Sequence, residues 1–106
     1  MCDAAKVRAL NDAFRQSLMG GRVVATRGRL ALPDLPTIVR RVQEHSDFDE
    51  GNDPHLEHDF GAFMHHDQQI FWKIDTYDLD LQFGSPDPSD PAVTTRILTV
   101  LLASEY

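Results

Sequence analysis

The stretch HLEHDFGAFMHHDQQIFWKIDTYD, residues 55–78, holds the alternation of apolar and polar side chains that decides the fold. Two runs, about residues 60–65 and 70–77, carry apolar residues at every second position, which predicts two strands with one buried face each. The four residues HDQQ between them predict a hairpin turn. If His65 pairs with Ile70, one face of the hairpin carries the predicted core, namely Gly61, Phe63, Ile70, Trp72 and Ile74.

The same pairing defines the other face of the hairpin. It sets His58 opposite Tyr77 and predicts a mixed surface that needs partial cover, made of Phe60, Ala62, Met64, Phe71, Lys73, Asp75 and Tyr77. Between residues 44 and 90, Lys73 is the single base among thirteen acids. An ion pair with Asp75 is therefore its expected task.

Helical periodicity flanks the hairpin. Apolar residues at intervals of three and four predict an amphipathic helix over about residues 3–19, ended by Gly20 and Gly21. RVVATRG (22–28) predicts a short strand, and about residues 34–45 predict a second helix with Pro36 in its first turn. Near the end, Asp90 can cap and Pro91 can open a third helix, whose surface is apolar over much of its circumference.

These elements predict one α+β domain over residues 1–106, with a small antiparallel sheet and a central hairpin packed by three helices, in the order α-β-α-β-β-α. A chain of this length folds around one core without a metal or a disulfide, and no cofactor is expected. Cys2 is the only cysteine, and no apolar run approaches the ~20 residues that cross a bilayer. We expect a cytoplasmic protein that does not engage a membrane.

The net charge of −7 is unevenly distributed. Residues 1–43 carry eight basic residues and three acids, whereas residues 44–90 carry thirteen acids and Lys73. Either the two parts neutralise each other in the fold, or the acidic part presents a negative face to a basic partner. Direct binding of nucleic acid is disfavoured by the sign of the excess charge. The acids predicted to contact a partner are Asp47, Asp49, Glu50, Asp53, Asp78, Asp80 and Asp87.

Three stretches stand out as a set: LNDAFRQSLMGGRVV (10–24), NDPHLEHDFGAF (52–63) with FWKIDTYD (71–78), and GSPDPSDPAVTTRILTVLLASEY (84–106). Together they resemble a small domain-of-unknown-function family of alphaproteobacteria that is often carried on conjugative plasmids and other mobile elements. The matching positions are Glu57, His58, Asp59, Phe60 and Gly61, then Trp72, Lys73, Ile74, Asp75 and Asp78. The resemblance transfers no catalytic residue. It implies the setting of mobile-element accessory proteins, some of which counter restriction or CRISPR defences.

Two kinds of chemistry compete for the histidine-rich stretch. A metal site would use His55, His58 and Asp59, although their spacing is not the H-E-x-x-H pattern that places two imidazoles on one helix face. An acid/base site would use His58, Asp59, Lys73, Asp75 and Tyr77 across the hairpin. Without either chemistry, EHDFG (57–61) is a polar network that specifies the fold.

The first functional prediction is a small acidic interaction protein that blocks a basic, nucleic-acid-binding defence protein by presenting a negative surface. The alternative is a metal-dependent or acid/base hydrolytic enzyme that uses His58, Asp59 and Asp75. A homodimer through the apolar last helix is a third possibility.

Overall fold

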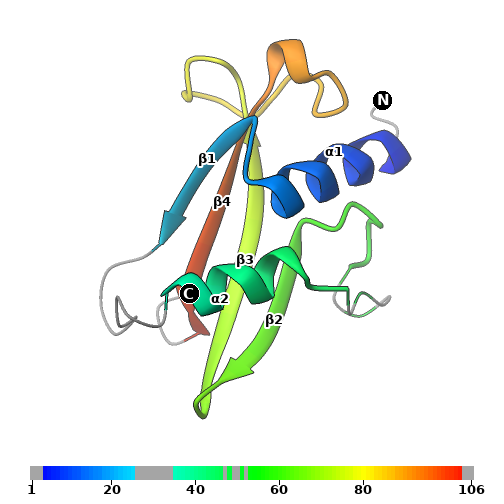
Figure 1. The fold of residues 1–106 in the computed structure, drawn as a ribbon. Helices are drawn as coiled ribbons and strands as arrows, with labels where there is room; N and C mark the ends of the chain where they lie inside the picture. The colour runs from blue at the N-terminus through cyan, green and yellow to red at the C-terminus, as the bar shows by residue number, and fades with distance from the viewer. Residues whose placement is uncertain (1–3, 26–34, 47, 49–50, 52, 104–106) are drawn as a thin grey trace.

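Two α-helices pack against one face of a four-stranded sheet in the computed structural model, which describes residues 4–25, 35–46, 48, 51 and 53–103 (Figure 1). The elements follow the chain as α1 (Ala4–Ser17), β1 (Gly21–Ala25), α2 (Leu35–Gln43), β2 (Phe60–His65), β3 (Gln68–Tyr77), the 3-10 turn η2 (Pro91–Val93) and β4 (Thr95–Leu102). Neither α1 nor α2 has the length and apolar character needed to cross a lipid bilayer. The predicted α+β class is confirmed.

The sheet is mixed, which corrects the predicted antiparallel arrangement. Its strand order is β1-β4-β3-β2, with β4 parallel to β1 and antiparallel to β3. The hairpin of β2 and β3 is present, but it forms one edge of the sheet, which corrects its predicted central position. The first strand and the last strand along the chain are therefore neighbours in the sheet, and β1 is held there by its pairing with β4.

The predicted hairpin register is wrong by two residues. Phe60 pairs with Lys73 and Gly61 with Trp72, because the turn consists of His66 and Asp67 alone. Both have left-handed backbone, with φ of 47° and 64°, as two-residue turns of type I′ require. A shift of two residues preserves the faces of a strand, so the predicted core face is kept.

The pairing of His58 with Tyr77 is lost with the register. Tyr77 pairs with Thr95 of β4 and forms an isolated bridge with Gly84. The side chains of the face away from the helices are mostly half-buried, and Phe60 packs against Phe71 there with ring centroids 5.2 Å apart.

The predicted third helix is wrong, because residues 95–102 form the strand β4. Asp90 does cap a helical turn, accepting a hydrogen bond from Ala92 N at 2.9 Å, but that turn is the three-residue η2. β-branched residues dominate the stretch TTRILTV (94–100) and favour a strand. The burial of β4 alternates from Thr95 to Val100, and only its last three residues are buried in succession. The apolar run at this end of the strand explains the wrong helix prediction. The predicted homodimer interface on a last helix is not present, because residues 95–102 form a strand.

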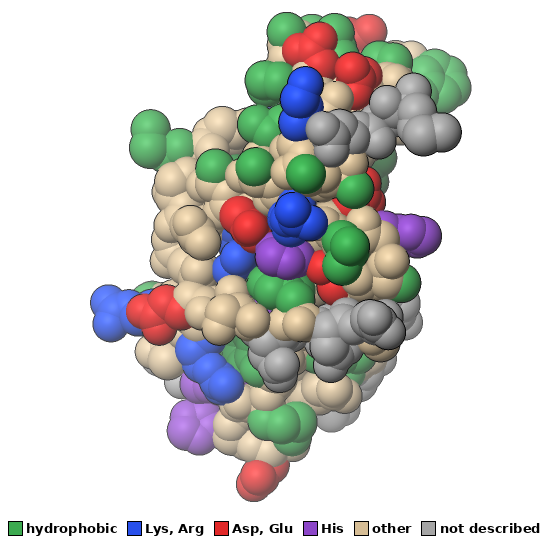
Figure 2. Space-filling view, turned by 90° about the vertical axis from the view of Figure 1, so that its right-hand side faces the viewer, with side chains coloured by type: hydrophobic (Ala, Val, Ile, Leu, Met, Phe, Trp, Pro, Cys, Tyr) green, Lys and Arg blue, Asp and Glu red, His purple; other side chains and the backbone are tan. Residues whose placement is uncertain are grey.

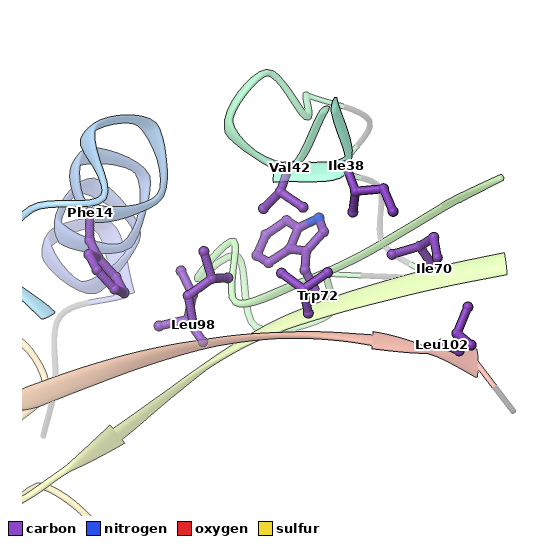
Figure 3. Close-up of a cluster of buried hydrophobic side chains, with 9 residues drawn as sticks. Phe14, Ile38, Val42, Ile70, Trp72, Leu98 and Leu102 are labelled. Atoms are coloured by element: carbon purple, nitrogen blue, oxygen red, sulfur yellow. The ribbon is translucent and has the colours of Figure 1, made fainter. Parts of the chain in front are cut away.

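Trp72 of β3 is the centre of the core and has no exposed surface. Figure 3 shows Ile38 and Val42 of α2 above its ring, with Phe14 of α1 beside Leu98 of β4. The spacing of Ile38 and Val42 by one helical turn places both on the buried side of α2. Trp72 therefore joins α2 to the middle of the sheet.

Gly61 of β2 is needed where Trp72 crosses it. A Cβ atom at Gly61 would lie 2.4 Å from Nε1 and 2.6 Å from Cε2 of the indole. The indole is enclosed by the core and has no room to move away. The glycine of the EHDFG signature is thus explained by close packing.

Gly61→Ala should lower the free energy of unfolding by about 1–3 kcal/mol, the usual cost of forcing extra volume into a packed core. Urea unfolding followed by tryptophan fluorescence measures the change. Gly84→Ala is the matched control, since a Cβ atom there meets nothing within 4 Å. Equal unfolding midpoints for the two variants would contradict this account of Gly61.

Candidate functional site

The segment 53–59, which leads into β2, is attached to α1 by side chains that recur along one helical face. Asn11 Nδ2 donates to Glu57 O at 2.9 Å, and Arg8 Nη1 donates to Leu56 O at 3.2 Å. The side chains of Asp12 and His58 form a hydrogen bond at the same junction. Figure 2 shows His, acidic and basic side chains lying side by side in the middle of this face.

His58 is held between two carboxylates. Its Nδ1 lies 2.9 Å from Oδ1 and 3.0 Å from Oδ2 of Asp12, and its Nε2 lies 3.5 Å from Oδ2 of Asp53. The ring also stacks on Phe48, with centroids 3.8 Å apart and planes 4° apart. Because both ring nitrogens face carboxylates, the arrangement suits a structural imidazole better than a free general base.

The backbone around His58 is strained and locally supported. His58 and Leu56 have left-handed φ values of 52° and 57°, which are uncommon for residues other than glycine. Asp53 supports this path, since its Oδ1 accepts the backbone N–H groups of Glu57 at 3.2 Å and His58 at 3.0 Å. Asp53 is only 2% exposed, so its carboxylate stabilises the backbone of this segment and does not form part of the protein surface.

Arg15 connects the same cluster to α2. Its Nη1 donates to the carbonyl oxygens of Val42 at 2.9 Å, Gln43 at 3.0 Å and His45 at 2.9 Å, where α2 ends. Its Nη2 donates to Asp12 Oδ1 at 3.1 Å. The side chain is 2% exposed, and its guanidinium carbon lies 5.3 Å from the Trp72 ring centroid. A cation at a helix C-terminus compensates the unpaired carbonyl groups there.

Two carboxyl groups of the EHDFG signature are less acidic than usual. Burial, followed by the charge of Asp59, raises the pKa of Glu57. Burial also raises the pKa of Asp59, which is opposed by a backbone hydrogen bond and assisted by Asp53.

The structure does not bring together the residues predicted for acid/base chemistry. Lys73, Asp75 and Tyr77 lie on the sheet face away from the helices, where Lys73 Nζ pairs with Asp75 Oδ2 at 3.2 Å. His58 contacts α1 on the other side. For the metal prediction, His55 is exposed, and the part of the chain that the structure describes contains no group of three His, Cys, Asp or Glu side chains able to hold an ion.

The acids predicted to contact a partner separate into three groups. Asp47, Asp49 and Glu50 lie outside the described residues. Asp53 is buried, as given above. The last three lie on the connection between β3 and β4, and they are Asp78, Asp80 and Asp87. Asp87 Oδ1 accepts from Ser89 N at 3.1 Å and Ser89 Oγ at 2.6 Å, whereas Asp80 is exposed.

The residues 78–84, here called the β3–β4 tip, expose two large apolar side chains that the sequence did not single out. Leu79 is 63% exposed and Phe83 is 72% exposed. Figure 1 places this connection at the upper end of the molecule. The alternation of acids and apolar residues in DLDLQF (78–83) was the available signal.

The β3–β4 tip is closed by hydrogen bonds. Asp78 N donates to Phe83 O at 2.9 Å, Leu81 N donates to Asp78 O at 3.1 Å, and Gln82 N donates to Asp78 Oδ1 at 3.0 Å. Leu81 contributes a left-handed φ of 60°. The exposed apolar side chains are therefore carried on a defined backbone.

Comparison with known proteins finds one family. A family model described as "Protein of unknown function (DUF3768)" matches residues 5–105. No curated protein and no solved structure matches the chain.

Arg15→Lys should lower the free energy of unfolding by at least about 2 kcal/mol, because an ammonium group cannot reproduce the planar set of hydrogen bonds to three carbonyl groups and a carboxylate. Urea unfolding at neutral pH measures the change. Arg40→Lys, at an exposed position of α2, is the matched control and should stay within about 0.5 kcal/mol of wild type. A small effect at Arg15 would show that its contacts are dispensable.

Glu57→Gln should stabilise the protein at pH 7. A carboxyl group with a raised pKa binds protons more tightly in the folded state, so ionisation at neutral pH disfavours folding. The advantage of the variant should shrink as the pH falls and the native carboxyl regains its proton. Thermal unfolding over a series of pH values from 7 downward, with Glu44→Gln as control, tests the sign. A variant that loses stability at pH 7 would contradict it.

Proposed function

The chain belongs to the DUF3768 family of proteins of unknown function, and we propose that it acts as an interaction protein. In this proposal, the β3–β4 tip inserts Leu79 and Phe83 into a basic partner that binds nucleic acid. The observation that carries the proposal is the 72% exposure of Phe83 on a loop closed by hydrogen bonds.

An aromatic side chain held in water on an ordered loop has the properties of a binding hot spot. Exposed apolar groups that lie close together mark interaction surfaces more often than single ones do. Aromatic anchors supply much of the binding energy at protein interfaces. A loop that already has its bound shape loses little conformational entropy on binding. Phe83 supplies an exposed aromatic side chain on the hydrogen-bonded β3–β4 tip, and Leu79 is an exposed apolar side chain of the same tip.

The charge around the tip supports a basic partner. Asp78 and Asp80 flank Leu79, and neither of these two acids forms an ion pair within the described part of the chain. Arg8, Arg15 and Arg41 of the two helices donate to backbone carbonyl groups. Acids left in this state can occupy arginine and lysine sites that otherwise hold phosphates.

The setting of the proposed partner comes from the resemblance to proteins of mobile elements. Accessory proteins of such elements profit from blocking a defence protein at its nucleic-acid-binding surface. A negatively charged tip with an apolar anchor is suited to that competition. The enzyme alternative has less support, because Nδ1 of His58 is hydrogen-bonded to Asp12 and its Nε2 lies 3.5 Å from Oδ2 of Asp53.

The double variant Leu79→Ser, Phe83→Ser should lower affinity for the partner by about tenfold or more, the effect of removing anchor side chains. Tagged wild-type and variant proteins are compared by quantitative capture from a bacterial host extract, and affinity is then measured with the purified partner. Unfolding midpoints should be unchanged, since both residues are exposed.

Met64→Ser is the matched control, because Met64 is 55% exposed on β2 and remote in sequence from the tip. Its affinity should equal that of wild type, and wild-type binding should weaken with added salt. Equal capture by the double variant, or affinity independent of salt, would refute the proposal.

A further inference from the structure

A cavity of about 180 Å³ lies beside α1, at the side of the fold where η2 meets the helix. It is lined by the second half of α1, by the link to β1, by Pro91 and by Arg96, and its α1 and link residues are Leu10, Ala13, Phe14, Ser17, Met19 and Gly20. None of these belongs to the β3–β4 tip. The walls are largely apolar, and Arg96 is the one charged residue among the described residues that line the cavity.

Arg96 is a buried cation, with 5% of its surface exposed. Its Nε donates to Asn11 Oδ1 at 2.7 Å, and its Nη2 donates to Pro88 O at 2.5 Å. Both acceptors are neutral. Nη1 donates to no atom of the described residues, so the guanidinium retains donor capacity where it lines the cavity.

The positive charge of Arg96 has no ion pair in the described part of the chain. Burial lowers the pKa of Arg96, and the more distant charge of Glu57 opposes this. A buried guanidinium without a carboxylate at contact distance is costly to the fold. A bound anion would remove that cost by taking the unused donors.

The shape and charge of the cavity select the kind of anion. One guanidinium balances a single negative charge, and Glu57 nearby disfavours a doubly charged group such as phosphate. The apolar walls favour a ligand with an apolar group. The volume lies below the roughly 300–1,000 Å³ of drug-sized sites, so the ligand is small.

We infer that this cavity binds a small monocarboxylate, whose carboxylate pairs with Arg96 and whose apolar group packs against α1. A free acid and the C-terminal carboxylate of a peptide offer the same chemistry. The site does not depend on the β3–β4 tip, and it would give the protein a second, small ligand.

The test is a titration of the full-length protein, labelled with ¹⁵N, with benzoate, isovalerate, N-acetyl-glycyl-leucine and its amide. Each carboxylate that binds should shift the Arg96 Nε–H and Ala13 amide signals saturably, and the amide should not. The dipeptide arm tells a chain terminus from a free acid. Absence of saturable shifts with every carboxylate up to about 20 mM, where even millimolar binding is visible, overturns the inference.

Ala13→Leu should weaken binding by at least about tenfold, because the larger side chain fills the cavity while Arg96 is left in place. Ala9→Leu adds the same atoms at another exposed position of α1 and should bind as wild type does. Arg96→Lys should also lose binding, but Ala13→Leu is decisive because it leaves the hydrogen bonds of Arg96 intact. Unchanged binding in Ala13→Leu, or equal shifts with inorganic phosphate, overturns the inference.

Discussion

The contacts of Arg15 with the end of α2 hold together parts of the fold that have few other connections. One guanidinium reaches two carbonyl groups of α2, the carbonyl group of His45 just after it, the carboxylate of Asp12 and the ring of Trp72. The two helices pack on the same side of the sheet, and α2 meets the core through Ile38 and Val42 alone among its buried residues. Its position over Trp72 therefore relies on the polar connection to α1.

The path of segment 53–59 follows from the same cluster. Asp12 accepts from Arg15 and faces His58, so its carboxylate joins the helix pair to the segment that leads into β2. The left-handed backbone at His58 costs free energy. Such a conformation persists only where surrounding contacts fix it. Asp53 supplies those contacts through two backbone N–H groups. The contacts of the EHDFG signature are thereby explained by its role in the fold.

The sequence predicted the two α-helices, the hairpin and its core face, because periodicities of 3.6 and 2 are local properties. It missed the hairpin register, since the left-handed His66–Asp67 turn lacks the glycine that marks such turns. β4 was missed because an Asp-Pro start caps a 3-10 turn as well as an α-helix, and because the consecutive buried residues at the end of the strand resemble an apolar helix. Exposure of Phe83 and burial of Asp53 depend on tertiary contacts that no local pattern contains.

Arg15 and Arg96 are both buried cations near Asn11 and Asp12, yet their surroundings differ in charge. Arg15 faces a helix C-terminus, which carries partial negative charge, and also a carboxylate. Arg96 faces an amide oxygen and a single carbonyl group, and it borders open volume. The charge of Arg15 is therefore compensated within the fold, although its Nε has no hydrogen-bond partner among the described residues. Arg96 keeps a charge without an ion pair in the described part of the chain, and a ligand can use it. The difference separates an arginine that builds the structure from one that is available for binding.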